Sequence, residues 1–177
     1  ILAETQAQAT SNVQWRNNLF LGENAAPVLF DINNYTSYTT SDYNGFRPNP
    51  GVAKSFQWDS PPAGVAIDTL GPNARPQLEN RQFATLQEYS QATGQDRNSI
   101  LVDYDIFVKV PRLDASVISS LQKLYKAEDF DFSLKPGAAA VDRGVALPTI
   151  TNGFAGRAPD LGALEVGQAP PHYGPRP

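Results

Sequence analysis

Two runs near the end of the chain constrain its fold more than any other feature. The first covers residues 130–144 and the second covers residues 158–165. The first run begins with Phe130, Phe132 and Leu134, which alternate with polar residues and predict a strand with one buried face. After that strand, glycine, proline and aspartate dominate, so we expect loops and short extended pieces up to the end of the chain.

The turn-forming and acidic residues of these runs have distinct physical roles. Pro136-Gly137 predicts a turn, and Gly144 is expected to adopt a positive φ. Asp142 is placed to cap exposed backbone N–H groups. The small residues after Asp160 suit close packing of backbone against a neighbouring element. For these aspartates and for Glu165 we favour structural roles over the alternative roles of catalytic carboxylates or calcium ligands.

Three strand-like regions occupy the first part of the chain, at residues 13–22, 27–32 and 38–45. Asn18 and Asn44 lie in the first and third of these regions, 26 residues apart. Asparagine suits a sharp bend because it tolerates left-handed backbone and its amide bonds neighbouring backbone groups. The spacing predicts a repeat of one coil every twenty-odd residues.

One short helix is expected between Leu86 and Thr93. Thr85 and Glu88 form the pattern of a capping box, and Gly94 is the expected C-terminal stop. Residues 100–108 have the apolar composition of a further strand.

The composition excludes several classes of site. Cysteine is absent and His172 is the one histidine, so disulfides, cysteine-based zinc sites and a Ser-His-Asp triad built on a core histidine have no support. The net charge is −4 and no basic cluster occurs, so we expect no nucleic-acid partner. No apolar stretch approaches the roughly 18 residues of a membrane span. Methionine is absent and no signal peptide is recognisable, so we expect a processed product or part of a longer protein.

Taken together, the motifs resemble those of right-handed parallel β-helix proteins of the pectate-lyase-like, or polysaccharide-lyase-like, kind, and specifically their C-terminal part. The family's closing signatures are Leu-x-Pro-Gly-Ser-Pro-Ala-x-Asp-x-Gly and Pro-Asp-x-Gly-Ala-x-Glu, and this chain matches them from Leu134 to Gly144 and from Pro159 to Glu165. It departs at Ala138-Ala139, where Ser-Pro is usual. The strand region at 13–20, the turn at 41–44 and the capped helix with the segment after it also fit.

The resemblance implies an all-β fold, a right-handed parallel β-helix of which this chain holds the C-terminal coils, with loop excursions and one short capped helix. We divide the chain accordingly into the last regular coils (1–45), a loop excursion with a short helix and strand (46–115), a closing segment (116–168) and an extended proline-rich tail (169–177). The resemblance also implies a secreted, periplasmic or cell-surface protein that binds polysaccharide. Ca²⁺ is a cofactor of such proteins, although no metal ligand is identified here.

The function that the resemblance favours is that of a polysaccharide lyase. The alternatives are a β-helix glycoside hydrolase and a non-catalytic surface, matrix or sugar-binding protein, and the missing N-terminal coils would supply much of any catalytic site. A lyase neutralises a uronate carboxylate and removes the α-proton with a base. The candidates for these tasks are Arg16, Arg47 and Tyr43, followed by Lys54 and Lys109. The alternative for each cation is a solvated charge on the outside of a coil.

Aromatic and acidic residues supply the remaining candidates. Trp58 and Tyr43 are candidates for stacking on a sugar ring, and Trp58 is expected to be the more exposed tryptophan because it lies between polar residues beside a proline-rich loop. Trp15 is expected in the core. A hydrolase would draw its two carboxylates from four aspartates, for which the alternative is turn capping: Asp31, Asp42, Asp103 and Asp105.

A β-helix that begins at residue 1 exposes the edge of its first coil. We therefore expect a covering partner, either the N-terminal remainder of the same protein or a second copy of the chain. The residues that would need this cover are Val13, Trp15, Leu19 and Leu21.

Overall fold

The computed structural model describes residues 3–5, 12–22, 28–33, 39–60, 79–111 and 116–170. Strands dominate this part of the chain, and the helix α1 (Leu86–Thr93) is the one helix in it longer than four residues. The expected all-β class is therefore confirmed. None of the described helices is long and apolar enough to cross a membrane. Most of the expected proline-rich tail lies outside the described residues.

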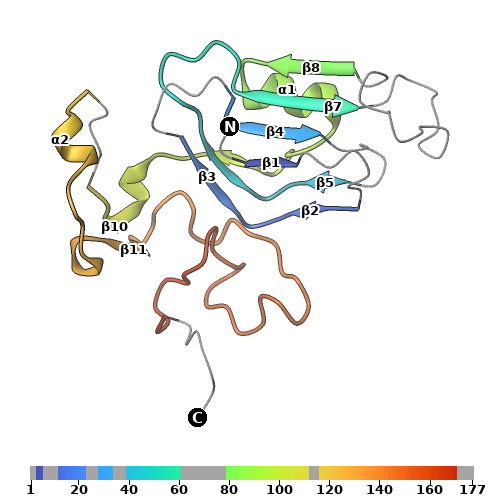
Figure 1. Ribbon diagram of the computed structural model, residues 1–177. Helices are drawn as coiled ribbons and strands as arrows, with labels where there is room; N and C mark the ends of the chain where they lie inside the picture. The colour runs from blue at the N-terminus through green and yellow to red at the C-terminus, as the bar shows by residue number, and fades with distance from the viewer. Residues whose placement is uncertain are drawn as a thin grey trace.

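Seven short strands are arranged in three small parallel sheets (Figure 1). The chain visits the three sheets in a fixed order and then repeats that order. One sheet contains β1, β4 and β7, a second contains β2 and β5, and a third contains β3 and β6. The bounds are β1 Ala3–Thr5, β2 Gln14–Trp15, β3 Leu19–Leu21, β4 Phe30–Asn33, β5 Thr40–Ser41, β6 Gly45–Arg47 and β7 Phe56–Ser60.

The register of the sheets repeats with the spacing that the two asparagines predict. Gln14 pairs with Thr40, Leu19 with Gly45 and Phe30 with Phe56. At the corner between β5 and β6, Asn44 is fully buried and its Oδ1 accepts from the backbone N–H and the Nδ2 of Asn18, at 3.0 and 3.1 Å and 26 residues away in the chain. The 26-residue spacing between the two asparagines is therefore also the spacing between paired strands. The hydrogen bonds between Asn18 and Asn44 satisfy buried polar groups across that spacing.

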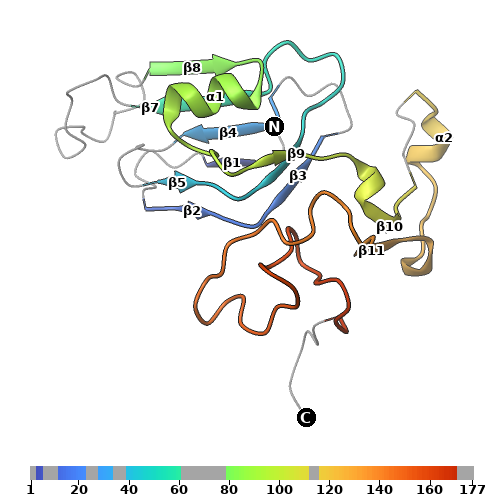
Figure 2. The same ribbon diagram turned by 180° about the vertical axis from the view of Figure 1, so that it is seen from behind.

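The regular order ends after β7. Strand β8 (Glu79–Phe83) pairs with β7 in antiparallel orientation, and α1 follows it and packs against both strands (Figure 2). The chain then returns through β9 (Ile100–Leu101), which adds to β6 in parallel. The two other described strands, β10 (Phe107–Lys109) and β11 (Asp131–Leu134), form a separate antiparallel pair, and the short helix α2 (Ile118–Leu121) lies between them in the chain.

The capping box of α1 is confirmed in detail. The Thr85 hydroxyl accepts from the Glu88 N–H at 3.1 Å, and the Glu88 carboxylate accepts from the Thr85 N–H at 3.3 Å. Gly94 ends the helix in the left-handed conformation, with φ of 74°. Local sequence alone fixes this element, since every group involved lies within a few residues of the helix ends.

Residues 100–108 do not form the continuous strand that their composition predicts. After β9 the chain makes a single 3₁₀ turn, Tyr104–Ile106, before β10 begins. The cause is Asp103, whose carboxylate accepts from the Tyr104 N–H at 2.7 Å and starts the turn. An aspartate that bonds the next backbone N–H competes with strand pairing.

Two hydrophobic cores lie on opposite faces of the sheet formed by β3, β6 and β9. The inner core is enclosed by the three sheets and α1, and it consists of Phe20, Leu29, Phe30, Phe46, Phe56, Trp58 and Tyr89. The outer core lies between that sheet and the residues that follow β9, and it consists of Ile106, Phe107, Leu134, Ala140 and Leu161. Leu19 and Leu21 point away from the inner core and are covered by the outer one.

Strand β11 buries less than its sequence predicts. Leu134 is buried as expected, but the Phe132 side chain is 52% exposed. Phe132 packs edge-on against Phe107 and stacks on Phe130, so its contacts are with other rings of the β10–β11 pair. The alternation predicted a buried face, but β11 has one neighbouring strand, and no larger sheet covers Phe132.

The closing loops (residues 135–170) are held by turns at the expected places, with one correction. Gly137 has φ of 77°, as a Pro-Gly turn requires. Gly144 is not left-handed; instead Asp142 is, with φ of 57°. Gly144 is needed for space, because a Cβ there would lie 2.7 Å from the Pro159 carbonyl oxygen and 2.9 Å from Asn17 Oδ1.

Candidate functional site

Arg47 is a structural residue and is not available to a substrate. It is 6% exposed, and its Nε bonds Asp103 Oδ1 at 2.5 Å. Its Nη1 donates to the Gly22 carbonyl, and its guanidinium lies 4.9 Å from the centre of the Tyr104 ring. This side chain ties β6 to the turn after β9, so its guanidinium is not exposed as a candidate cation for a lyase would be.

Arg16 also bonds its own framework. Its guanidinium donates to the Trp15 carbonyl at 2.8 Å, and to the carbonyl and the hydroxyl of Thr40 at 3.0 and 2.8 Å. These bonds link β2 to β5 from the side. Of the two lysine candidates, Lys54 is exposed, and Lys109 donates to the Glu128 carbonyl at 2.9 Å.

Trp58 is buried, so the expectation that it stacks on a sugar is wrong. Its side chain is 0% exposed and packs against Tyr89 of α1, with ring centres 5.9 Å apart. The polar neighbours Gln57 and Asp59 indicated exposure, but in a strand they point to the opposite face. Trp15 packs edge-on against Phe20 and Phe30, in agreement with the core position expected for it.

Of the candidates from the sequence, Tyr43 lines a cavity. It lies at the corner between β5 and β6 with φ of 55°, beside a polar hollow of about 330 Å³. The residues that line this hollow come from the corner, from the segment after α1 and from the closing loops; they are Tyr43, Arg97, Asn98, Ser99, Asp142, Arg143 and Gly144. We call this cavity the Tyr43 hollow.

Sequence reasoning missed the two arginines of the Tyr43 hollow. Arg97 and Arg143 are both exposed, and neither makes a hydrogen bond or ion pair with another residue in the part of the chain that the structure describes. The available signal was weak: each arginine directly follows an aspartate that turns the chain with positive φ, Asp96 at 51° and Asp142 at 57°. The hollow thus gathers two free cations and one phenol.

The walls of the Tyr43 hollow are fixed by backbone hydrogen bonds. Asp42 accepts from the N–H and the Nδ2 of Asn98 at 2.7 and 2.8 Å, and from the N–H of Tyr43 at 2.9 Å. On the other side, the Asn17 amide exchanges two hydrogen bonds with the backbone of Val145, at 2.8 and 2.9 Å. Asn17 therefore holds the closing loops against the corner that carries Tyr43, whose carbonyl accepts from the Asn17 N–H.

The carboxylates of the closing loops serve as caps, as expected. Asp142 Oδ1 accepts from the N–H groups of Arg157 and Ala158, and these bonds lower the Asp142 pKa. Asp160 accepts from the N–H of Asp142 with one oxygen and of Val166 with the other, both at 2.8 Å. Both Asp160 oxygens therefore accept hydrogen bonds from backbone N–H groups, as a capping side chain does. Among the described residues, no group of three or more His, Cys, Asp or Glu side chains is placed to hold a metal ion.

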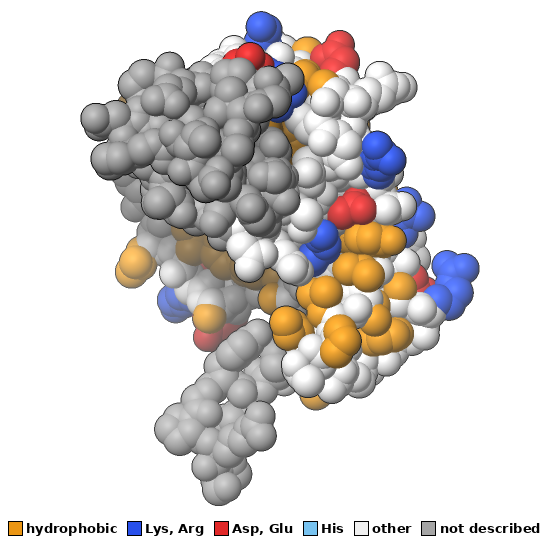
Figure 3. All heavy atoms as spheres, turned by 90° about the vertical axis from the view of Figure 1, so that its right-hand side faces the viewer, with side chains coloured by type: hydrophobic (Ala, Val, Ile, Leu, Met, Phe, Trp, Pro, Cys, Tyr) orange, Lys and Arg blue, Asp and Glu red, His pale blue; other side chains and the backbone are white. Residues whose placement is uncertain are grey.

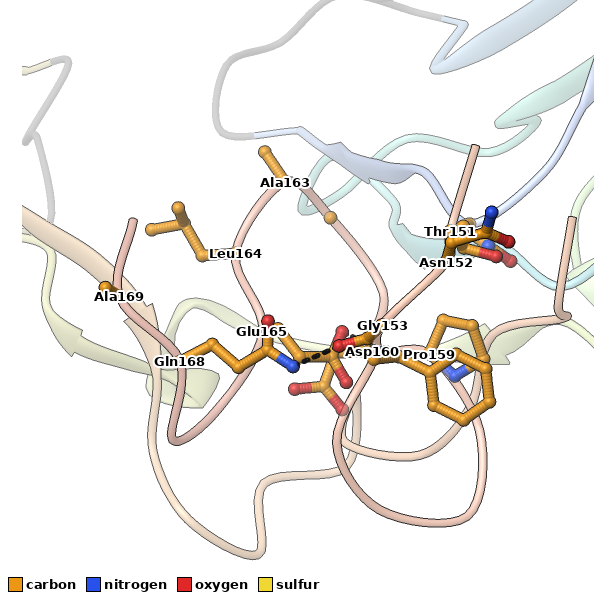
Figure 4. A pocket seen from close by; sticks show the side chains of 13 residues that line it. Thr151, Asn152, Gly153, Pro159, Asp160, Ala163, Leu164, Glu165, Gln168 and Ala169 are labelled. Atoms are coloured by element: carbon orange, nitrogen blue, oxygen red, sulfur yellow. Dashed lines mark hydrogen bonds between the residues drawn. The ribbon is translucent and has the colours of Figure 1, made fainter. Parts of the chain in front are cut away.

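A second cavity, of about 300 Å³, lies among the closing loops (Figure 4). Glu165 and Asp160 point toward each other there, and Glu165 Oε2 accepts from the Asp160 N–H at 3.1 Å. Desolvation raises the pKa of Glu165, and the neighbouring Asp160 charge adds to this. This carboxyl group stabilises a loop, and the cavity presents no cation for an acidic sugar.

The aspartates considered for a hydrolase are used by the framework. Asp42 and Asp103 accept backbone N–H groups, and Asp31 is buried in β4. Asp103 precedes and Asp105 is the middle residue of a 3₁₀ turn, so neither lies in a strand. Of the two interpretations, turn capping is confirmed for Asp103.

A buried acid lies behind the Tyr43 hollow. Asp96 is 2% exposed, and its Oδ1 accepts from Ser99 Oγ at 2.6 Å and from Asn44 Nδ2 at 3.1 Å. Burial raises the Asp96 pKa, and its partners only partly offset this. Burial and the nearby Asp96 charge also raise the pKa of Tyr89. The cluster joins α1 to the asparagine corner.

Comparisons with known proteins give no match from which a function could be transferred. No protein-family model matches the chain, and neither a search of curated proteins nor a search of solved structures finds a match.

Proposed function

We propose that residues 1–177 form the C-terminal coils and closing loops of a secreted right-handed parallel β-helix protein that acts on polysaccharide as a lyase. The observation that carries this proposal is the repeated order of the three parallel sheets at a constant register, with a buried asparagine bonding its counterpart one layer away. Return of the chain to the same sheet after about 26 residues supports a solenoid coil. The antiparallel β8, α1 and the closing loops are then the end of the solenoid.

The Tyr43 hollow supports the lyase function over other chemistry. A lyase removes the proton α to a uronate carboxylate, and the electron pair left on that carbon forms a double bond as the neighbouring C–O bond breaks. Tyr43 is the residue that we assign to the proton transfers of this step: as a phenolate it takes the α-proton, and the hydroxyl so formed returns a proton to the departing sugar oxygen. Arg97 and Arg143 are placed to stabilise the negative charge that develops on the carboxylate. Arg16 and Arg47 take no part, because both bond the framework.

The test is an assay of the intact protein on anionic polysaccharides, followed by the ultraviolet absorbance of an unsaturated product. We expect absorbance to rise with polyuronates and to be lost in Tyr43→Phe. Release of reducing ends without absorbance would instead indicate a glycoside hydrolase. Binding with no product at all would indicate a non-catalytic sugar-binding or matrix protein, which is the second candidate because two arginines that are free in the described part of the chain can bind an anion without any chemical step.

We also propose that the first coil is covered by a partner. In the described residues β1, β2 and β3 each pair with one strand, so each has a free edge. The N-terminal remainder of the same protein and a second copy are the two candidate partners. Expression of residues 1–177 alone tests this proposal: we expect aggregation or dimerisation, and a monodisperse monomer with a cooperative melting transition would contradict it.

A further inference from the structure

The Tyr43 hollow holds more positive charge than its own carboxylate balances. Asp142 is the acid among the lining residues, and it already accepts two backbone N–H groups and lies 3.6 Å from the Arg157 Nε. These contacts lower the pKa of Asp142, so its carboxylate is ionised. Its partners are Ala158 and Arg157, not Arg97 or Arg143. The other carboxylate at the wall, Asp42, accepts from Tyr43 and Asn98, and among the described residues neither Arg97 nor Arg143 pairs with it. The two guanidinium groups therefore have their hydrogen-bond donors available for a ligand.

We propose that Arg97, Arg143 and Tyr43 form a subsite for one acidic sugar residue, in which the guanidinium groups bind its carboxylate or sulfate group. The inference rests on the polysaccharide class of the proposed function, and it does not depend on lyase chemistry. Guanidinium groups suit this task because they present planar, paired donors that match a carboxylate or sulfate. The phenol of Tyr43 adds an aromatic face and one hydroxyl.

The size of the hollow limits how large a ligand it can bind. Its volume of about 330 Å³ lies at the lower end of the range for small-molecule sites, roughly 300–1,000 Å³. One sugar ring fits this space better than several. The rest of a polysaccharide would lie outside, where the exposed side chains of both arginines also reach solvent.

The hollow is also built before a ligand arrives. Tyr43 is held by backbone bonds to Asn17 and Asp42, and Asn98 is held by the same aspartate. Gly144 packs so closely on Asn17 that a side chain there would collide. A site whose walls are already ordered loses less entropy on binding, so weak single contacts are enough to select a charged sugar over a neutral one.

The experiment compares three probes on the intact protein by isothermal titration calorimetry. They are an oligosaccharide of galacturonic acid, its methyl-esterified form and a sulfated oligosaccharide of similar length. We expect the acid to bind and the ester to bind at least about tenfold more weakly, since the ester loses the charge-assisted hydrogen bonds that a carboxylate makes. The sulfated probe separates carboxylate from sulfate as the preferred group.

The variants Arg97→Gln and Arg143→Gln should each weaken binding of the acid by about tenfold or more and leave binding of the ester unchanged. Lys126→Gln is the matched control, because it removes an exposed charge that is not among the lining residues and should change the binding of neither probe. Melting temperatures check that the variants fold. Equal binding of acid and ester, unchanged affinity in both arginine variants, or no binding of either charged probe would overturn the subsite. Binding without an unsaturated product would leave the subsite in place and overturn only the lyase.

Discussion

The inner and outer cores are built on two different principles. The inner core is mostly aromatic, and its rings repeat in register: Phe20 stacks on Phe46, with centres 5.2 Å apart, and Phe30 aligns with Phe56. The outer core is mostly aliphatic and comes from loops and short elements with no repeat. One core is therefore specified by the register of parallel strands, and the other by individual anchors such as Asn17 and Leu161. Truncation of one side chain should therefore destabilise the whole inner core. In the outer core the destabilisation should remain local.

The exposed surface reflects the same difference. Figure 3 shows apolar side chains gathered on the lower part of one face, at the height of the closing loops in Figure 1. Ile150 of these loops is 77% exposed. The closing loops leave Ile150 in solvent, whereas the coils bury Phe20, Phe30 and Phe46 almost completely.

The largest expected effect comes from Phe46→Ala in the inner core. Phe46 is fully buried and contacts three other rings, Phe20, Phe30 and Phe56. We expect a loss of about 3–5 kcal/mol in the free energy of unfolding, with the whole molecule destabilised. Denaturant unfolding measures it. Phe46→Leu is the milder control, and a loss below about 1 kcal/mol for Phe46→Ala would contradict a register-specified core.

A smaller and more local effect is expected from Leu161→Ala in the outer core. Leu161 is buried against β6, where its Cδ1 lies 3.3 Å from the position of a Cβ on Gly45. We expect a loss of about 2–4 kcal/mol, with faster hydrogen exchange confined to the closing loops and β10–β11. Leu124→Ala, at a side chain that is 91% exposed, should change stability by less than about 0.5 kcal/mol. Faster exchange in β4 and β7 would show that the two cores are a single unit.

What the sequence predicts follows the same division. The capping box at Thr85 and the asparagine repeat were predictable because each depends on local spacing or on an identical residue one coil away. Burial of Trp58 was not, since it depends on α1 returning to place Tyr89 against it. The Tyr43 hollow was half predictable: Tyr43 was named, but Arg97 and Arg143 reach it only because Asn17 holds the closing loops beside the corner. Contacts that join distant, non-repeating segments leave no periodic signal in the chain.

A pH dependence is expected where the inner core meets the asparagine corner. The folded pKa of Asp96 is raised, chiefly by burial, while the unfolded value is about 3.9. Between these two values the unfolded chain has released a proton that the folded protein still holds, so stability is fully present below the unfolded pKa and falls as pH rises through the folded pKa. Asp42 and Tyr89 are the other titratable groups that face this carboxyl.

The measurement is the free energy of unfolding across the acidic range for the wild type and for Asp96→Asn. The variant keeps a side-chain oxygen that accepts from Ser99 and Asn44. Its free energy of unfolding should no longer fall with rising pH as Asp96 makes it fall in the wild type. Asp105→Asn, which replaces an exposed carboxyl, is the control and should show the same pH dependence as the wild type. Parallel curves for wild type and Asp96→Asn would show that the buried carboxyl does not set the pH dependence.

The smallest effect is expected at the start of α1, which closes the inner core beyond β7. Thr85→Ala removes the hydroxyl that accepts from the Glu88 N–H and should lower the free energy of unfolding by about 0.5–2 kcal/mol. Thr85→Ser keeps the oxygen and should recover most of the loss. Because α1 carries Tyr89 into the inner core, the loss should appear in the global transition and not only as fraying of the helix. Thermal melts followed by circular dichroism and by tryptophan fluorescence distinguish these outcomes. A helix signal that falls before the fluorescence of Trp58 changes would mean that α1 unfolds independently. The strands of the coils would then keep the inner core folded without α1.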